Sequence, residues 1–321
     1  MISLKKKYLE FSNSENSIPI FSQGWWLDAT VIDAKWNVAI VENKGVILAT
    51  MPYVIKKSYG FTILSMPSLT QNLGPWLKTS EVKYNKILSQ QKKLMNALIV
   101  QLPKYDYFVQ NWHYSQTNWL PFYWHGFEAS TFYTYVIEDL SDIDFIWASL
   151  KENIRYDIRK AQNKIGISVR SDLSVDDFIS LNRLTFCRQK KLMPYPISFI
   201  KTLIEKARQR NQCKWFIGQD KSKKNHAGVL IVWDDQSAYY LMGGGDPELR
   251  NSGATSLCMW EAIKFASTVT KKFDFEGSMI EPIETFFRGF GAIQKPYLRL
   301  THKPSKIFNT LFFLKKIITD K

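Results

Sequence analysis

The feature that most constrains the fold is a strand, a glycine-rich loop and a helix in direct succession. The stretch YYLMGGGDPELRNSGATSLCMWEAIKFAS begins with an apolar strand, passes through three glycines and enters a helix near Gly253. Small residues at the start of a helix expose backbone N–H groups, and the helix dipole adds partial positive charge. We expect a site for a pyrophosphate-like anion at Arg250, Asn251, Ser252, Gly253, Ala254 and Thr255. The alternative is an ordinary loop with Ser252 as the helix N-cap.

The helix that follows carries one carboxylate within its apolar face. At helical spacing one face contains Ala254, Leu257, Cys258, Ala262, Phe265, Ala266 and Val269, and Glu261 falls within that stripe. A carboxylate that faces a core must be hydrogen-bonded or have a raised pKa. We expect Glu261 to be a structural anchor, with a catalytic base as the alternative.

A second group of carboxylates follows in KKFDFEG, residues 271–277. Strand alternation places Phe273 and Phe275 on one face and Asp274 and Glu276 on the other. Carboxylates at the end of a strand beside an anion loop suit proton transfer to or from an amine or hydroxyl, and Glu276 is the expected base. Arg288, in a predicted short helix over 282–289, is a candidate to neutralise an oxyanion or phosphate. The alternative is a salt bridge from Asp274 or Glu276 to Arg288.

The rest of the chain alternates strands and helices in two similar runs. The first run contains a helix within 21–30, a hairpin over 37–57 with its turn at Asn43, Lys44 and Gly45, a helix over 82–102, and strands over 105–114 and 131–140. The second contains helices over 146–164, 175–190 and 197–210, strands over 213–219, 227–234 and 237–244, the helix from Gly253, and strands over 271–277 and 294–302. We therefore expect a duplicated α/β unit.

Length and composition agree with two domains and a cytoplasmic setting. A chain of 321 residues with 45% hydrophobic residues can build two cores. A net charge of +14 favours nucleic acid, a phosphorylated cofactor or an anionic membrane surface as partner, or simply a basic protein. The three cysteines and four histidines have no metal-ligand spacing, so we expect no metal. Neither a signal peptide nor an apolar stretch of about 20 residues is recognisable.

Two further segments are candidates for contact with an acceptor. QNWHYSQTNWLPFYWHGF contains Trp112 and His113, and aromatic faces beside a titratable group suit a sugar or peptide. The alternative is an aromatic core with exposed edges. Arg155 and Arg159 share a helical face with Lys151, which could hold a phosphorylated acceptor or could be a solvated face.

The order strand, Arg-x-x-Gly-Ala loop, helix, strand, helix resembles the acetyl-CoA site of the GNAT acyltransferase superfamily. The segments GATSLCMWEAIKFAS and FDFEGSMIEPIETFFRGFGA are similar to the FemABX branch, whose members carry tandem GNAT-like domains. NLGPWL and NIRYDIRKAQ resemble its glycine-proline loop and its basic helix after the domain junction. The resemblance covers most of residues 20 to 300.

Departures from the FemABX pattern bear on the donor. Thr255 stands where the phosphate loop usually has a smaller residue. Aminoacyl-tRNA-dependent members have a lysine where this chain has Phe287, with Arg288 next, and some carry a coiled-coil arm that is not recognisable here. These differences favour an acyl-CoA donor over aminoacyl-tRNA.

The resemblance implies an α/β fold with mixed sheets, in which two tandem GNAT-like domains face each other across a cleft. The expected domains are 1–140 on the acceptor side and 141–303 with the donor site. The implied function is acyl transfer from acyl-CoA to an amine or hydroxyl of a cell-envelope glycan or peptidoglycan precursor. The alternatives are an aminoacyl-tRNA-dependent cross-bridge aminoacyltransferase and a non-catalytic, membrane-associated binding protein on a GNAT scaffold.

The remaining segment, 304–321, is basic and amphipathic. Ile307, Leu311, Leu314 and Ile318 share one helical face, and Lys306, Lys315 and Lys316 supply charge. Such a helix can lie on the headgroups of an anionic leaflet, or it can dock on its own domain. We expect peripheral contact with the inner face of the membrane.

Overall fold

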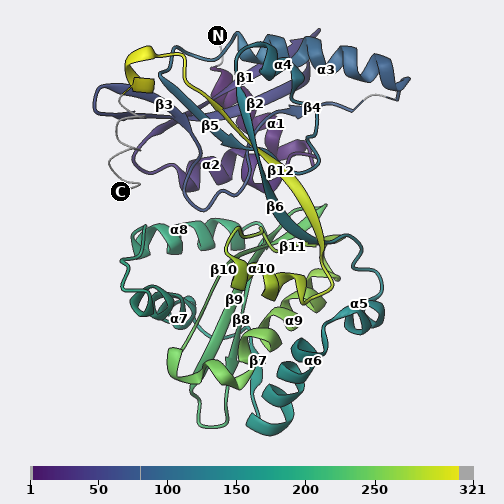
Figure 1. The fold of residues 1–321 in the computed structure, drawn as a ribbon, viewed down its shortest axis with the longest axis vertical. Coiled ribbons are helices and arrows are strands. Elements are labelled where there is room, and N and C mark those ends of the chain that lie inside the picture. The colour runs from purple at the N-terminus through teal and green to yellow at the C-terminus, as the bar shows by residue number, and fades with distance from the viewer. Residues whose placement is uncertain (1–2, 80, 311–321) are drawn as a thin grey trace. The chain divides into compact units, whose positions relative to one another are not determined.

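A computed structural model describes residues 3–79 and 81–310 of the chain (Figure 1). The chain forms two compact units. Unit 1 comprises Met1–Phe132 and Pro296–Lys321, and unit 2 comprises Tyr133–Lys295. The expected domain ranges, which change at residues 140 and 303, stay a prediction about functional domains.

Unit 1 is built on a mixed sheet in the order β1-β2-β3-β5-β12, with β4 paired to β2. These strands are β1 (Lys35–Asn43), β2 (Val46–Ser58), β3 (Phe61–Ser65), β4 (Trp76–Leu77), β5 (Tyr107–Asn111) and β12 (Ile293–His302). The predicted hairpin is confirmed. Lys44 and Gly45 form its two-residue turn with φ of 48° and 80°, as a turn that matches the strand twist requires.

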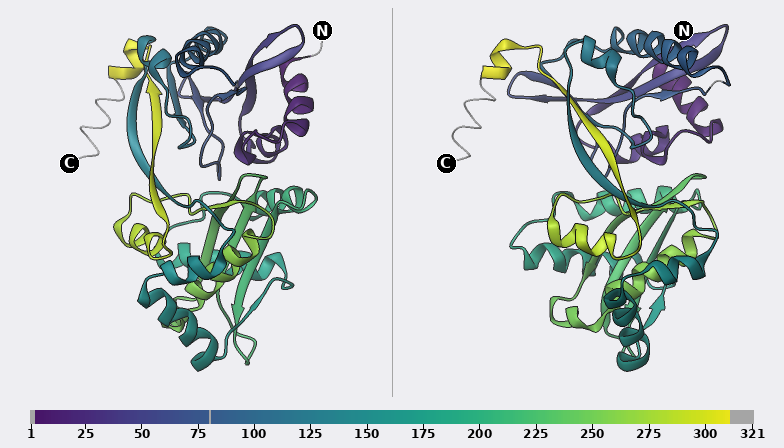
Figure 2. Two further views of the ribbon diagram at one scale, coloured as in Figure 1. Left: turned by 90° about the vertical axis from the view of Figure 1, so that its right-hand side faces the viewer. Right: turned by 45° about the vertical axis from the view of Figure 1, so that its right-hand side comes forward.

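Helices cover both faces of this sheet (Figure 2). They are α1 (Leu4–Ser14), η1 (Ile20–Ser22), α2 (Gly24–Thr30), α3 (Tyr84–Ile99) and α4 (Leu120–Trp124). Val38 and Ile40 of β1 pack with the α1 and α2 side, whereas Ala39 packs with α3 through Leu94 and Leu98. Alternate residues of one strand therefore serve two cores, as the period of two requires.

Unit 2 contains the sheet β6-β11-β10-β9-β8-β7. Its strands are β6 (Glu128–Ile137, which begins in unit 1), β7 (Ser168–Arg170), β8 (Cys213–Gln219), β9 (Asn225–Trp233), β10 (Ser237–Gly245) and β11 (Lys272–Asp274). β10 and β11 are parallel, and the other neighbours are antiparallel.

The helices of unit 2 are α5 (Ile143–Ser149), α6 (Glu152–Arg159), η2 (Lys160–Ile165), α7 (Val175–Arg188), α8 (Ile197–Arg208), η3 (Pro247–Ser252), α9 (Ala254–Ala266) and α10 (Glu281–Arg288). α7 and α9 cover opposite faces of the sheet (Figure 1). Phe178 of α7 lies against Gly228, whereas the neighbouring Val229 packs with the α9 core. The single helical stretch expected over 146–164 is divided at Leu150, where the backbone is extended.

Both units use the same order of elements. Three antiparallel strands lead through a helix to a parallel strand, as β1-β2-β3-α3-β5 in unit 1 and β8-β9-β10-α9-β11 in unit 2. The last strand of each is exchanged. β5 pairs with β12 from the end of the chain, and β11 pairs with β6 from the middle. The expected duplicated α/β unit is confirmed.

The C-terminal segment is described only as far as Thr310. Phe308 stacks on Tyr107 at 5.3 Å between centroids and meets the edge of Phe61 at 5.2 Å, so this part docks on unit 1. Residues 311–321 lie outside the described part, and membrane contact through them stays a prediction. None of the described helices is long and apolar enough to cross a bilayer.

Candidate active site

The site in unit 2 lies where β10 and β11 separate. The two strands pair only from Ser237–Lys272 to Tyr239–Asp274. β10 then shifts register between Tyr240 and Met242 and continues to Gly245, whereas β11 ends at Asp274. Beyond Tyr239, the edge of β10 that faces β11 therefore has no strand partner among the described residues.

The glycine-rich loop after β10 forms η3 and then the start of α9. Gly253, with φ of 80°, is the N-cap of α9, and no side chain caps this end. Ser252 is therefore not the N-cap, although its hydroxyl accepts the amide of Ala254 at 3.3 Å. Within residues 3–79 and 81–310, the amides of Thr255 and Ser256 have no acceptor. The first turn of α9 thus presents two unsatisfied N–H groups, as the sequence predicts for an anion site.

Of the six residues expected in this loop, only three reach solvent. Arg250, Asn251 and Thr255 are exposed, whereas Ser252, Gly253 and Ala254 are buried. A Cβ atom at Gly253 would lie 2.2 Å from the carbonyl oxygen of Asp157. The glycine therefore permits close packing of the loop against α6, in addition to its left-handed backbone conformation.

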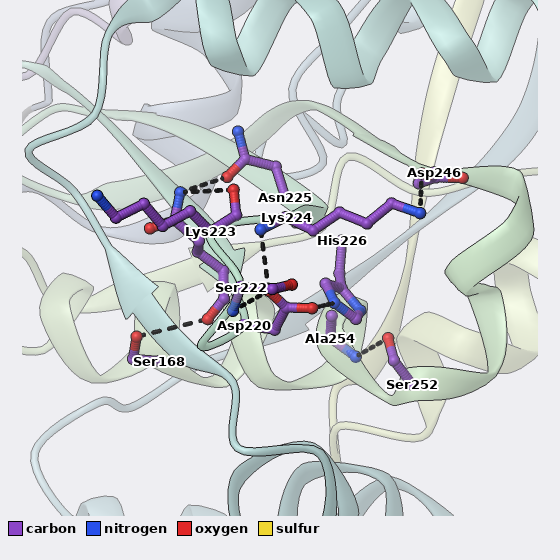
Figure 3. A network of polar contacts seen from close by, with 11 residues as sticks. Ser168, Asp220, Ser222, Lys223, Lys224, Asn225, His226, Asp246, Ser252 and Ala254 are labelled. Carbon is purple, nitrogen blue, oxygen red and sulfur yellow. Dashed lines mark hydrogen bonds and ion pairs between the residues drawn. The ribbon is translucent and has the colours of Figure 1, made fainter.

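A polar network holds the β8–β9 turn beside this loop (Figure 3). The Asp220 carboxylate accepts the Ser222 hydroxyl at 2.7 Å, the Lys224 amide at 2.9 Å and His226 Nε2 at 3.1 Å. These hydrogen bonds, the Ser222 hydroxyl first, hold the pKa of Asp220 well below its usual range. The carbonyl of His226 in turn accepts the amide of Asp246, just before η3.

His226 is buried close to the start of α9, and Figure 3 shows its ring beside Ala254. Its Nδ1 has no hydrogen-bond partner among the described residues. Sequence reasoning missed this residue, because a lone histidine at the start of an apolar strand carries no metal-ligand or catalytic spacing.

The two carboxylates of β11 differ in their surroundings. Asp274 is 3% exposed and accepts hydrogen bonds from the Thr134 hydroxyl and, at 2.8 Å, from the Glu276 amide. Burial raises the pKa of Asp274 to about 6, although these hydrogen bonds oppose the shift. Asp274 is thus a buried carboxyl with its hydrogen bonds made.

Glu276 follows in a left-handed conformation, with φ of 64°, and Gly277 continues it with φ of 65°. β11 therefore ends three residues earlier than the predicted strand. Glu276 Oε1 is shielded from solvent and has no partner in the described part of the chain. Burial, and then the charge of Asp274, raise the pKa of Glu276 well above its usual value. An unpaired, basic carboxyl is the group that general base catalysis requires.

Arg288 does not pair with Asp274 or Glu276, which corrects that alternative. Its Nε donates to Glu284 at 2.8 Å, one turn earlier on α10. Glu284 also accepts the Tyr135 hydroxyl at 2.7 Å, and Tyr135 accepts Gln294 Nε2 at 2.6 Å. The i, i+4 spacing on α10 places Arg288 next to Glu284, so Arg288 pairs within its own helix and not with β11.

Glu261 does not point into the core, which corrects the expectation that it lies within the buried face of α9. Its side chain is 27% exposed and pairs with Lys264 at 2.8 Å. The true buried face of α9 is displaced toward Met259, Trp260 and Ile263. A catalytic role for Glu261 stays an untested alternative.

The expected acceptor residues are separated. Trp112 is fully buried and meets the edge of Phe122 at 4.8 Å, so it belongs to the core of unit 1, and the alternative holds for this residue. His113 is partly exposed. In unit 2, Arg155 donates to the Ala148 carbonyl at 3.0 Å, and the Arg159 guanidinium lies 5.7 Å from the Trp147 ring centroid. No group of His, Cys, Asp and Glu side chains in the described part could hold a metal ion.

Comparisons with known proteins agree with this geometry. Residues 148–278 match the family model of the acetyltransferase (GNAT) domain. No curated protein matches the chain. The structure of FemX superposes with a TM-score of 0.66 at 13% identity, covering 93% of this chain and 96% of FemX.

Two further solved structures have similar folds. A tandem GNAT protein from the clavulanic acid pathway has a TM-score of 0.52 at 8% identity, covering 94% of each chain. A C-terminal domain described as a lysylphosphatidylglycerol synthetase, from Agrobacterium fabrum, has a TM-score of 0.58 at 9% identity, covering 98% of this chain and 97% of that one. The chain therefore has the FemABX-like tandem GNAT fold, and the part of its second unit from residue 148 to 278 is similar to the GNAT domain.

Proposed function

We propose that the protein transfers an acyl group from acyl-CoA to an amine or hydroxyl of a cell-envelope glycan or peptidoglycan precursor. The observation that carries this proposal is Glu276, a half-buried residue with a raised pKa, whose Oε1 is shielded from solvent and has no partner among the described residues. It stands at the end of β11, where β10 and β11 separate. A merely structural carboxyl at this depth would be paired.

In the proposed reaction, Glu276 takes the proton from the acceptor amine or hydroxyl, directly or through a water. The acceptor then attacks the thioester carbonyl, the C–S bond breaks, and CoA leaves as the thiol after protonation. The raised pKa brings the basicity of Glu276 closer to that of the group it must deprotonate. Asp274 acts as a positioning residue, because it binds the Glu276 amide.

The donor pyrophosphate would lie at the first turn of α9. The amides of Thr255 and Ser256 supply donors, and Arg250 supplies an exposed charge beside them. CoA is favoured over aminoacyl-tRNA because Phe287, which stands where tRNA-dependent relatives have lysine, is buried against Phe275. Its surroundings leave no room for a solvent-facing cation.

The acceptor class rests on the fold neighbours alone. One of them is described as a lysylphosphatidylglycerol synthetase, a name that denotes an aminoacylated membrane lipid. Aminoacyl transfer from tRNA stays the second candidate, favoured by the net charge of +14. A non-catalytic binding protein is the third.

One experiment separates these functions. The full chain is incubated with acetyl-CoA and a set of envelope glycan and peptidoglycan precursors, and thiol release is measured, with thermal shifts recorded in parallel. Acceptor-dependent thiol release and stabilisation by CoA are the expected results. Transfer from aminoacyl-tRNA without any CoA effect would favour the second candidate. The absence of both transferase activity and CoA stabilisation would favour the third.

A further inference from the structure

Unit 1 contains a cavity of about 360 Å³ that none of the site residues discussed above explains, apart from His113 at its wall. It is open to solvent and is lined by four stretches of chain: the segment that leads into and includes η1, the loop that leads into and includes β4, helix α3, and the residues that follow β5. Its volume is within the range of small-molecule sites.

Two mostly buried residues present polar side chains in the wall of this cavity. Ser22 is 5% exposed and Asn72 is 8% exposed. Neither side chain makes a hydrogen bond to any residue within 3–79 or 81–310. Their hydroxyl and carboxamide groups are therefore available to a ligand in the cavity. Together they offer both donors and acceptors.

An aromatic ring with a fixed orientation forms another part of the wall. The Trp76 indole N–H donates to the Ser17 hydroxyl at 2.9 Å, and Phe11 meets the ring at 5.2 Å with a 69° interplanar angle. Because both contacts hold the ring, its conformational entropy is lost before any ligand binds. Aromatic faces pack against the apolar C–H faces of rings whose edges carry polar groups.

The charges of the lining define the ligand further. Among the residues that the structure describes, no Asp or Glu lines the cavity, and Lys78 and His113 are the only titratable residues in its lining. Lys78 is exposed, and His113 Nδ1 is engaged by the Ser115 hydroxyl at 2.7 Å. Apart from these two, the lining is amide, hydroxyl and apolar, with Gln116 and Leu94 as examples. A cation would find no counter-charge, and an anion only one exposed ammonium.

We propose that this cavity binds a neutral saccharide unit, with its C–H face on Trp76 and its hydroxyls on Ser22 and Asn72. Binding is independent of the chemistry in unit 2. That the saccharide is part of the acyl acceptor rests on the proposed function, and is a deeper statement of it.

The test is saturation-transfer NMR on the full chain with methyl glucoside, methyl galactoside, methyl mannoside and N-acetylglucosamine. At least one of these saccharides should show saturation transfer from the protein to its ring protons. Asn72→Leu, which removes the unpaired carboxamide at similar size, should weaken that transfer at least fivefold. The melting temperature should stay unchanged or rise, because the substitution removes no hydrogen bond within residues 3–79 and 81–310.

Asn85→Leu is the matched control, because Asn85 is exposed on α3 outside the lining. This substitution should leave the saturation transfer to the saccharide unchanged. Ser22→Ala, a smaller change, serves as the second probe should Asn72→Leu unfold the chain. The proposal is overturned if no saccharide in the set shows transfer, if both cavity variants bind as the wild type does, or if inorganic phosphate displaces the signal.

Stabilisation by acetyl-CoA is measured on the same samples. Saturation transfer to a saccharide without stabilisation by CoA would contradict the proposed function and support the saccharide site in the cavity. Stabilisation by CoA without saturation transfer to any saccharide would support the proposed function and overturn the saccharide site.

Discussion

The main-chain amide of Glu276 donates a hydrogen bond of 2.8 Å to the carboxylate of Asp274, two residues earlier. This bond closes a tight turn in which Glu276 takes φ of 64°, a conformation that costs an L-residue about 1–3 kcal/mol unless its surroundings hold it. Asp274 is itself held by the Thr134 hydroxyl from β6. The two carboxylates therefore have different expected roles, one positioning the backbone and the other presenting an unpaired oxygen.

Glu276→Gln tests the base. The amide keeps the size of the side chain but cannot accept a proton, so turnover should fall about 10²-fold or more. The dissociation constant for CoA should be unchanged, because the donor loop is on η3 and α9. Steady-state thiol release and calorimetric CoA binding measure the two quantities.

Glu281→Gln is the control for that measurement, since Glu281 is exposed in the first turn of α10. It should leave turnover at the wild-type level. Wild-type turnover by Glu276→Gln would exclude Glu276 as the base and leave Glu261 and His113 as candidates.

Asp274→Asn should move the pH dependence of catalysis. Burial is the main cause of the raised pKa of Glu276, and the negative charge of Asp274 is the second. Without that charge the pKa of Glu276 falls, so the acidic limb of the kcat/KM profile should shift to lower pH. A profile that keeps its midpoint would show that Asp274 does not act on the group that titrates.

The same substitution should change how stability depends on pH. The pKa of Asp274 is about 6 in the folded chain, above the ordinary value of 3.8, so the folded state binds more protons in this range. The free energy of unfolding should therefore decrease as pH rises from about 4 to 6, with a contribution of about 3 kcal/mol at most. Denaturant titrations at several pH values should show that Asp274→Asn lacks this part of the decrease.

Thr255→Glu should separate donor binding from stability. Thr255 is exposed in the first turn of α9, where a carboxylate interacts favourably with the helix dipole by about 0.3–1 kcal/mol. The same charge repels a pyrophosphate, so CoA affinity should fall at least tenfold while the melting temperature holds or rises. Thr255→Gln, the uncharged control, should keep most of the affinity. Equal CoA affinity in Thr255→Glu would place the donor elsewhere.

Gly253→Ala, unlike Thr255→Glu, should lower the stability of the fold. The added methyl group would lie 2.2 Å from the Asp157 carbonyl oxygen, and the residue has φ of 80°. Both effects destabilise the fold, by more than about 1 kcal/mol in total. Thermal unfolding should show this loss in the absence of any ligand, and a melting temperature equal to that of the wild type would contradict the close packing of the loop.

Local signals in the sequence were sufficient for most of the elements and for the start of α9, whereas its role as an anion site stays a prediction. Glycine at the start of α9, and Pro282 and Gly289 at the two ends of α10, are short-range features with known backbone preferences. The pairing of Arg288 with Glu284 was equally legible, because their i, i+4 spacing lies in the sequence itself.

Other features of the site depend on distant contacts. Nothing in FDFEGS indicates that Glu276, rather than Gly277 alone, takes a left-handed conformation. Trp112 and its aromatic neighbours have the same alternating pattern whether they face a ligand or a core. The cavity in unit 1 assembles from segments up to about a hundred positions apart, such as Ser22 and Gln116, and no local pattern relates them.

The exchange of β6 and β12 has a consequence for how the chain is made. Unit 1 begins at the first residue, yet its sheet can acquire β12 only when the ribosome has passed residue 302. Unit 2 already has β6, with Thr134, before the rest of its sheet is translated. The half that is synthesised first can therefore complete its sheet last, and a gene fragment that starts at residue 141 would encode a donor unit without the strand that supports Asp274.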